Sequence, residues 1–102
     1  MRIVSKAALK SFWKRHPAAE APLKLWHLRA REAQWENFAE VRATFPHADQ
    51  VKVKSGNVVT VFNAGGNNLR IVTAIHYNRS VVFVLLVLLH AEYSKSAWKE
   101  KL

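Results

Sequence analysis

The sequence contains no cysteine and only three proline and three glycine residues. The absence of cysteine excludes disulfides, thiolate zinc sites and cysteine nucleophiles. The longest apolar run, Val81–Leu89, is far shorter than the roughly 20 residues that a helix needs to cross a bilayer. The N-terminal sequence MRIVSKAALK lacks the continuous apolar stretch of a secretory signal. We therefore expect an intracellular protein that does not enter a membrane.

Acidic residues are also scarce, with seven Asp and Glu against sixteen Lys and Arg. The formal net charge is +9, and no acidic residue occurs from Gln50 to Ala91. Such a charge favours a polyanionic partner, and nucleic acid is the first to consider. The alternative is a solvated basic surface without a partner. We favour polyanion binding, because the acid-free stretch coincides with the predicted strands.

The length and composition bound the fold. The chain has 102 residues, of which 50% are hydrophobic and 23% charged, as in globular proteins. No linker, repeat or low-complexity segment interrupts it, so residues 1–102 are expected to form a single domain.

The N-terminal half has the periodicity of helices. Apolar residues recur at helical spacing over Lys6–Arg15, with Ser5 as a plausible N-cap. Pro22 suits the first turn of a second helix, and Trp35–Thr44 has the spacing of a third. The Phe45-Pro46 step ends the helical half, because the residue before a proline avoids the helical conformation.

The C-terminal half has the pattern of strands. The predicted strands are Val51–Lys54, Val58–Phe62, Leu69–Tyr77 and Val81–Leu89. These elements predict an α+β fold in which N-terminal helices pack on one face of a small antiparallel sheet. Phe62 and Phe83 are expected in the core. A short helix is expected within Ala91–Leu102, with Tyr93 and Trp98 docking it.

The five histidines lack the spacing of metal ligands, so no metal site is expected. The Gly65-Gly66 pair lacks the lysine of a phosphate-binding P-loop, and no dinucleotide-binding pattern is present. We therefore expect no cofactor.

Two residues near strand ends are candidates for chemistry. His90 follows the most apolar strand, where it can act as an acid or a base near neutral pH, or merely cap the last helix. Arg70 opens a strand after the loop rich in Asn and Gly, where a guanidinium can hold a phosphate through two hydrogen bonds. The alternative for Arg70 is a salt bridge to Glu92 or Glu40.

Other residues are candidates for binding nucleic acid. The alternation in Val51–Lys54 places Lys52 and Lys54 on one face of a strand, from which both can contact a phosphate backbone. Tyr77 and Tyr93 offer rings on which unpaired bases can stack.

Three segments together resemble one family. They are the run FNAGGNNLR from Phe62 to Arg70, the pair His76-Tyr77, and the sequence HAEY from His90 to Tyr93. In this order they are similar to the HigB family of type II toxins, which are small RelE-like proteins of bacterial toxin–antitoxin systems. The similarity extends over essentially the whole chain, including the step from Phe45 to Asp49.

The resemblance implies a ribosome-dependent endoribonuclease of the bacterial cytoplasm that cuts mRNA and arrests growth. It implies attack by the ribose 2′-hydroxyl without a metal or cofactor. It also implies neutralisation by a HigA-like helix-turn-helix antitoxin. The toxin would be bound to operator DNA only indirectly, through this antitoxin.

The resemblance also implies roles for particular residues. Arg70 would stabilise the phosphate, His90 would be the acid or base, and Tyr93 would orient or stack against the substrate. The residues implied to contact RNA or the ribosome are Lys52, Lys54, Asn63, Asn67, Tyr77 and Arg79. Asn63 and Asn67 would either shape the loop or contact the RNA backbone.

The last strand departs from the family pattern RxVxTHxEY. Leu85 stands at the position of the arginine and Leu89 at that of the threonine. The alternative reading is therefore an attenuated or inactive homologue that binds RNA, the ribosome or the antitoxin. An exposed leucine-rich strand is also an aggregation hazard, so we expect Leu85 and Leu89 to be covered, by the chain's own helices or by a partner.

Overall fold

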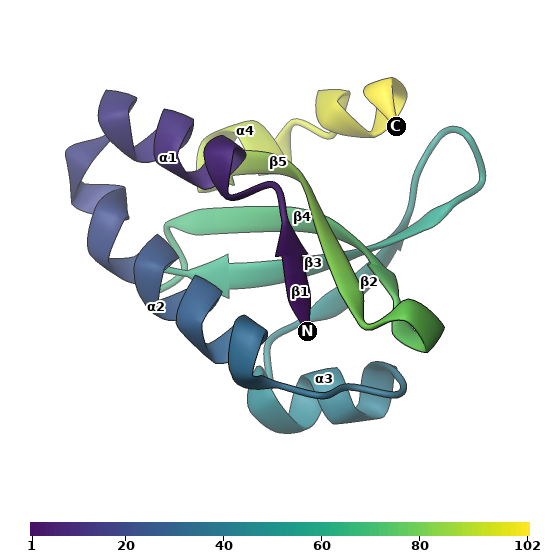
Figure 1. Ribbon diagram of the computed structural model, residues 1–102. Coiled ribbons are helices and arrows are strands. Elements are labelled where there is room, and N and C mark those ends of the chain that lie inside the picture. Colours follow the sequence, from purple (N-terminus) through teal and green to yellow (C-terminus); the bar gives the residue numbers. More distant parts are fainter.

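The computed structural model describes residues 1–102 and is built around one five-stranded sheet (Figure 1). The strands are β1 (Arg2–Val4), β2 (Asp49–Lys52), β3 (Val58–Ala64), β4 (Leu69–His76) and β5 (Val81–Leu89). Their order in the sheet is β1-β5-β4-β3-β2. The α+β fold class is confirmed.

Four α-helices and three short 3-10 helices accompany the sheet. They are α1 (Lys6–Arg15), η1 (Pro17–Ala19), α2 (Glu20–Glu32), α3 (Phe38–Thr44), η2 (Tyr77–Arg79), α4 (His90–Ser94) and η3 (Ala97–Lys101). The first helix has the predicted bounds, and Pro22 lies in the first turn of α2. None of the α-helices is long and apolar enough to span a membrane.

The third helix begins later than its apolar spacing predicts. Trp35 lies outside it, because the side chain of Asn37 accepts a hydrogen bond from the Glu40 amide at 3.0 Å and so caps a helix that starts at Phe38. Trp35 is nevertheless buried, and its indole N–H donates to the hydroxyl of Thr44 at 3.1 Å.

The sheet is mixed, and the prediction of an antiparallel sheet is wrong for one edge. β1 pairs in parallel with β5, with Arg2 opposite Val81 and Val4 opposite Phe83, whereas all other pairs are antiparallel. This pairing joins the first and last strands of the chain, so local periodicity carries no sign of it. It covers the free edge of the first part of β5, which reduces the hazard of an unpaired apolar strand.

Phe62 is at the centre of the main core, between the sheet and the N-terminal helices. It is fully buried, and its ring lies 5.3 Å from that of Trp26, 5.9 Å from Trp35 and 5.2 Å from Phe45. These partners come from α2, the loop before α3 and the end of α3, so Phe62 joins the three segments to β3. The prediction that Phe62 is a core residue is confirmed.

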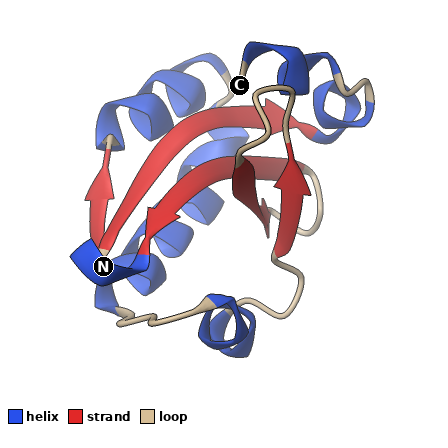
Figure 2. Ribbon diagram, turned by 90° about the vertical axis from the view of Figure 1, so that its right-hand side faces the viewer, coloured by secondary structure: helices blue, strands red, loops and turns tan.

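The opposite face of the sheet carries a smaller core. Side chains alternate along β3, so Val59 and Val61 face away from Phe62 and pack with Trp98. The indole of Trp98 stacks on the ring of Tyr93 at 5.2 Å and donates to the Tyr93 carbonyl at 3.0 Å. The predicted C-terminal helix is confirmed as α4 followed by η3, on the face away from α1 and α2 (Figure 2).

The leucines of β5 differ in burial. A bulge places Leu86 opposite Val72 and Val84 opposite Thr73, which leaves Leu85 as the extra residue. Leu85 is 37% exposed, so the chain's own helices do not cover it. Leu89, by contrast, packs against the main core.

Phe83 also differs from expectation. It is only half-buried and lies outside both cores, with its ring edge-on to His76 at 5.2 Å.

The aromatic cluster predicts a large effect of truncating Phe62. Phe62→Ala removes a fully buried ring and is expected to lower the free energy of unfolding by about 3–5 kcal/mol, measured by denaturant titration. Val58→Ala on the same strand is the matched control, because Val58 is 56% exposed. Equal stability of the two variants would contradict this account of the core.

Candidate active site at the paired ends of β4 and β5

The register of β4 and β5 brings the principal candidate residues together. Leu69 pairs with Leu89 and Arg70 with Leu88, so the start of β4 lies beside the end of β5, where His90 follows. The Nη2 atom of Arg70 lies 3.1 Å from Nδ1 of His90. The Arg70 guanidinium also lies 5.4 Å from the centre of the Tyr93 ring, within cation–π range. Arg70, His90 and Tyr93 therefore form one cluster.

The loop between β3 and β4 supports this cluster. Gly65 and Gly66 have φ angles of +59° and +60°, which glycine adopts without strain, and Asn67 follows at +83°. This path turns the carbonyl and side chain of Asn67 toward Arg70, which donates to them at 2.8 and 2.9 Å. Asn63 donates to the same side-chain oxygen at 3.1 Å. Asn63 and Asn67 thus shape the loop, as one of their two predicted roles requires.

Arg70 is a buried cation without a carboxylate partner. It is 7% exposed, and no acid lies within ion-pair distance of it. The alternative of a salt bridge to Glu92 or Glu40 is wrong, because Glu92 accepts from the Leu89 amide at 3.0 Å and Glu40 from the Glu36 amide. The positive charge of Arg70 is therefore not neutralised by the chain.

The hydrogen bonds of Arg70 limit how it can meet a phosphate. Each terminal nitrogen carries two N–H groups. Nη1 donates to the carbonyls of Asn67 and Leu69, and Nη2 to the Asn67 side chain and His90. The N–H groups of Nη1 and Nη2 are therefore all occupied. In this arrangement Arg70 cannot hold a phosphate through two of them, as the sequence predicted. Arg70 supplies its charge while holding the loop and His90 in place.

The same contact determines the tautomer of His90. A guanidinium can only donate hydrogen bonds, so Nδ1 of His90 must accept from Arg70. The neutral ring then carries its proton on Nε2. The ring is exposed, which leaves Nε2 free to meet a substrate. The side chain does not cap α4, whose N-cap is Leu89.

Tyr93 remains a neutral phenol near physiological pH. Burial raises the pKa of the Tyr93 hydroxyl, and the negative charge of Asp49 raises that pKa further, against the lowering effect of Arg70. Asp49 was not among the predicted site residues. It pairs with Val61, which places it on the same face of the sheet as Tyr93, and this position follows from strand register alone.

Lys52 and Lys54 do not share a strand face, so that prediction is wrong. β2 ends at Lys52, and Lys54 lies in the following turn. The amide of Lys54 donates to the Lys99 carbonyl at 3.1 Å, and its ammonium pairs with Glu100 at 3.1 Å. The contact with η3 redirects this segment, and it leaves Lys52 as the unpaired cation of the two.

Tyr77 and Arg79 lie at the other end of the same two strands. Both belong to η2, which connects the end of β4 to the start of β5. The structure does not bring them to His90. Burial raises the pKa of the Tyr77 phenol, against a lowering effect of Thr60. They line a separate groove with Arg2 and Arg31.

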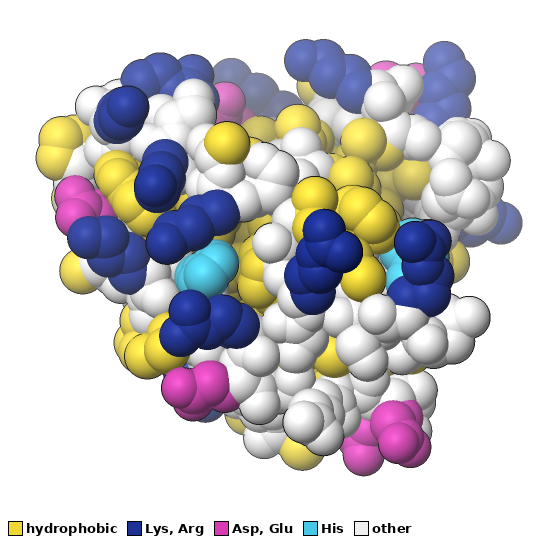
Figure 3. Space-filling model, viewed as in Figure 1, with side chains coloured by type: hydrophobic (Ala, Val, Ile, Leu, Met, Phe, Trp, Pro, Cys, Tyr) yellow, Lys and Arg dark blue, Asp and Glu magenta, His cyan; other side chains and the backbone are white.

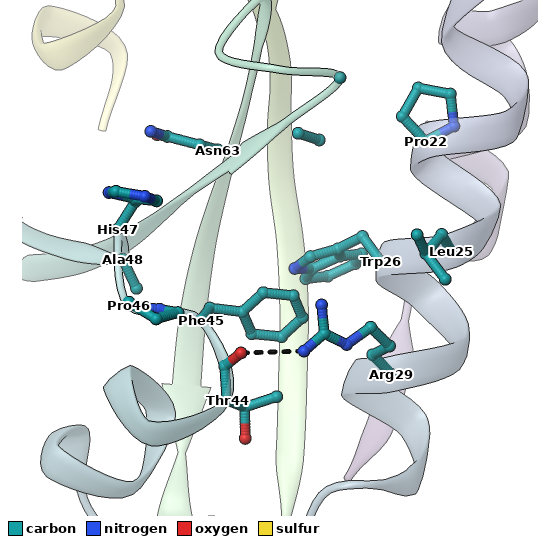
Figure 4. Close-up of a pocket in the computed structure, with 12 residues that line it drawn as sticks. Pro22, Leu25, Trp26, Arg29, Thr44, Phe45, Pro46, His47, Ala48 and Asn63 are labelled. Atoms are coloured by element: carbon teal, nitrogen blue, oxygen red, sulfur yellow. Dashed lines mark hydrogen bonds between the residues drawn. The ribbon is translucent and has the colours of Figure 1, made fainter.

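A pocket of about 240 Å³ lies on the helix side of the loop, between α2 and the segment from Thr44 to Ala48 (Figure 4). Its walls are Pro22, Leu25, Trp26, Arg29, Thr44, Phe45, Pro46, His47, Ala48, Asn63, Ala64 and Gly65. None of these residues is acidic. No group of three or more His, Asp or Glu side chains is placed to hold a metal ion.

The wider surface is also basic. Figure 3 shows Lys and Arg side chains spread over the face that includes α1 and α2, with few acidic side chains among them. The fold and the site together define a small α+β protein whose cation, imidazole and phenol converge at one edge of a sheet, a combination suited to an anionic phosphodiester.

Comparison with known proteins identifies the family. Residues 19–96 match the HigB toxin family, described as the RelE-like toxic component of a toxin–antitoxin system. The mRNA interferase HigB of Escherichia coli O6:H1 is 32% identical over 95 residues, which cover 93% of this chain and 90% of the relative. The mRNA interferase toxin HigB of Escherichia coli strain K12 is 26% identical over 93 residues, or 91% and 88% of the two chains. The chain belongs to the HigB toxin family, and the resemblance is confirmed.

The Arg70–His90 contact predicts the protonation of the imidazole. In the neutral ring, Nε2 should carry the proton, as read from the ¹⁵N chemical shifts of the two ring nitrogens. Arg70→Met removes the donor and should allow both tautomers to be populated. His76 is the internal control, because its ring contacts Phe83 rather than Arg70. A protonated Nδ1 in the neutral ring of the unmodified chain would contradict this assignment.

Proposed function

We propose that this toxin is a ribosome-dependent endoribonuclease that cuts mRNA and thereby inhibits translation and growth, with residues 1–102 acting as one toxin domain. The observation that carries the proposal is the contact between Arg70 and His90 beside Tyr93, at an edge of the sheet that the loop from Asn63 to Asn67 supports. The net charge of +9 suits an RNA substrate. The relatives named mRNA interferases support cleavage of mRNA.

The proposed reaction requires a base, an acid and a fixed positive charge. A base removes the proton of the ribose 2′-hydroxyl, whose oxygen then attacks the adjacent phosphorus. An acid protonates the 5′-oxygen as its bond to phosphorus breaks, which leaves a 2′,3′-cyclic phosphate and a free 5′-hydroxyl. Negative charge develops on the phosphate oxygens between these events, and a fixed positive charge stabilises it.

The proposed roles follow from the contacts of each side chain. His90 meets the substrate through Nε2, since Nδ1 is engaged by Arg70. It acts as the acid at the leaving 5′-oxygen when Nε2 holds the proton. It can act as the base only in the tautomer whose proton is on Nδ1, which breaks the contact with Arg70. Arg70 stabilises the developing charge electrostatically and positions His90. Tyr93 contributes a neutral hydroxyl and a ring against the guanidinium, and it orients or stacks against the RNA.

The proposed partners are the ribosome with its mRNA and a HigA-like helix-turn-helix antitoxin in the bacterial cytoplasm. Operator DNA is reached only through the antitoxin. Lys52 is the better placed of the two lysines for RNA contact, because Lys54 is paired with Glu100. Tyr77 and Arg79 lie at the far end of β4 and β5, so they suit a second contact with the ribosome.

A second candidate function is that of a binding protein with weakened or lost catalysis. The observation that favours it is the apolar strand before His90. Leu85 lies about 14 Å along β5 from Leu89, in a groove with Val53 and Leu102, and supplies no charge there. Leu89 directs its side chain into the main core rather than toward the RNA.

Substitution of His90 tests the leading proposal. His90→Ala is expected to lower cleavage roughly 100- to 10,000-fold, as is usual on removing an acid–base group, and to relieve growth arrest. Cleavage is measured by mapping mRNA 5′-ends before and after controlled induction. The fold should be retained, because the ring is exposed.

His76→Ala is the matched control, since His76 is also exposed but lies at the opposite end of β4. New 5′-ends within codons should appear with this control and not with His90→Ala. Undiminished cleavage by a folded His90→Ala variant would reject the site.

Restoring the family pattern distinguishes the two functions. Leu85→Arg with Leu89→Thr is expected to raise cleavage if the present chain is attenuated, because a second cation on the sheet face that carries Tyr93 can then contact the RNA strand. The measurement is the rate of mRNA cleavage by the folded double variant against the unmodified chain. An unchanged rate would show that these positions do not limit the reaction.

A further inference from the structure

The pocket between α2 and the Thr44–Ala48 segment lies beside the proposed reactive groups. It shares His47, Asn63, Ala64 and Gly65 with a second hollow that follows the loop as far as Asn67. Asn67 in turn contacts Arg70, which contacts His90. The two hollows therefore reach the loop whose Asn67 holds Arg70, and hydrogen bonds continue from there to His90.

The pocket has a hydrogen-bond donor that the protein leaves unused. Trp26 is 2% exposed, and its indole N–H has no hydrogen-bond acceptor. Figure 4 shows the indole nitrogen turned toward the side of the pocket where Phe45 and Asn63 lie. Buried N–H groups are normally hydrogen-bonded. A hydrogen-bond acceptor that enters this pocket would therefore satisfy the indole N–H of Trp26.

The other walls combine apolar surface with positive charge. The guanidinium of Arg29 lies 4.8 Å from the centre of the Phe45 ring and donates to the Thr44 carbonyl at 3.0 Å, so both contacts hold it in the wall. Leu25, 56% exposed, forms the outer rim. Aromatic, apolar and guanidinium surfaces are those on which unpaired bases stack, and walls without acidic residues suit an anionic strand.

The loop geometry favours RNA further. Gly65 packs closely under the pocket, since a Cβ there would lie 3.5 Å from Pro22. At Gly66 a Cβ would meet nothing within 4 Å, so the backbone is open to close approach by a phosphate or ribose. The volume of about 240 Å³ lies below that of pockets for drug-sized ligands and is appropriate for one base.

We propose that this pocket is a nucleotide subsite, in which one unpaired RNA base near the cut bond stacks against Leu25, Phe45 and Arg29 and accepts a hydrogen bond from Trp26. The inference rests on the proposed function, because the base must belong to the RNA held at His90. The subsite positions the RNA strand. It selects bases that present a hydrogen-bond acceptor to the indole N–H of Trp26.

Binding of a short RNA whose ribose groups are 2′-O-methylated tests the subsite, because such RNA cannot undergo 2′-hydroxyl attack. Its affinity is measured by fluorescence anisotropy with the full chain. Leu25→Asp is expected to weaken binding about tenfold, the usual loss on removing one stacked base. Leu28→Asp is the matched control, because Leu28 is on the same helix, 42% exposed, and absent from the pocket walls.

Two further variants probe the polar contacts. Arg29→Gln is expected to weaken binding as Leu25→Asp does. Trp26→Phe keeps a ring but removes the N–H, and it should reduce discrimination among RNAs that differ in one base. Should Trp26→Phe fail to fold, Leu25→Asp and Arg29→Gln still decide the question, since both side chains reach the surface.

The outcomes separate this inference from the proposed function. If the chain cuts mRNA in cells but Leu25→Asp and Leu28→Asp bind the RNA equally, the subsite is wrong and the function stands. If Leu25→Asp loses antitoxin binding and keeps RNA affinity, the pocket is an antitoxin surface and the inference is overturned. A chain that neither binds the RNA nor cuts mRNA rejects both proposals.

Discussion

The pairing of β4 with β5 is the constraint on which the site depends. Hydrogen bonds between these antiparallel strands set Arg70 opposite Leu88, and they end where Leu69 meets Leu89. A shift of one residue would turn Arg70 toward the N-terminal helices and away from Tyr93, because side chains alternate between the faces of a sheet. The apolar character of β5 stabilises the pairing, since its side chains contribute to both cores. Leu89, which departs from the family pattern, therefore contributes to the packing of the sheet that carries Arg70 and His90, whereas Leu85 is exposed and does not.

A buried arginine without a carboxylate is costly unless its N–H groups are satisfied. Here neutral acceptors satisfy them, from Asn67, Leu69 and His90, and the net charge of Arg70 remains. A carboxylate partner would have stabilised the guanidinium but neutralised the positive charge that the proposed reaction requires. The glycine loop makes this arrangement possible, because only its left-handed path presents both oxygens of Asn67 to one guanidinium. The backbone path of the loop therefore also determines that Arg70 keeps its net charge.

The two faces of the sheet support different parts of the candidate site. The N-terminal helices bury Phe62 and form, with the end of α3, the pocket that contains Trp26 and Arg29. The C-terminal segment buries Trp98 on the other face and places Tyr93 beside Arg70. The groove beside Leu85 remains uncovered between them.

Periodicity and local chemistry in the sequence determined most elements of this protein. The bounds of α1 and β5, the burial of Phe62 and the candidate pair Arg70 and His90 were all predictable, because apolar spacing and strand ends are local properties. Resemblance to the HigB family was visible for the same reason, since its motifs are short and contiguous.

Only the tertiary structure decided what these residues contact. The parallel pairing of β1, the ion pair of Lys54, the place of Asp49 beside Tyr93 and the pocket around Trp26 all join segments distant in the chain. The tautomer of His90 likewise depends on an arginine twenty residues away. Such contacts arise from register and packing between elements, on which the local pattern of a sequence places no constraint.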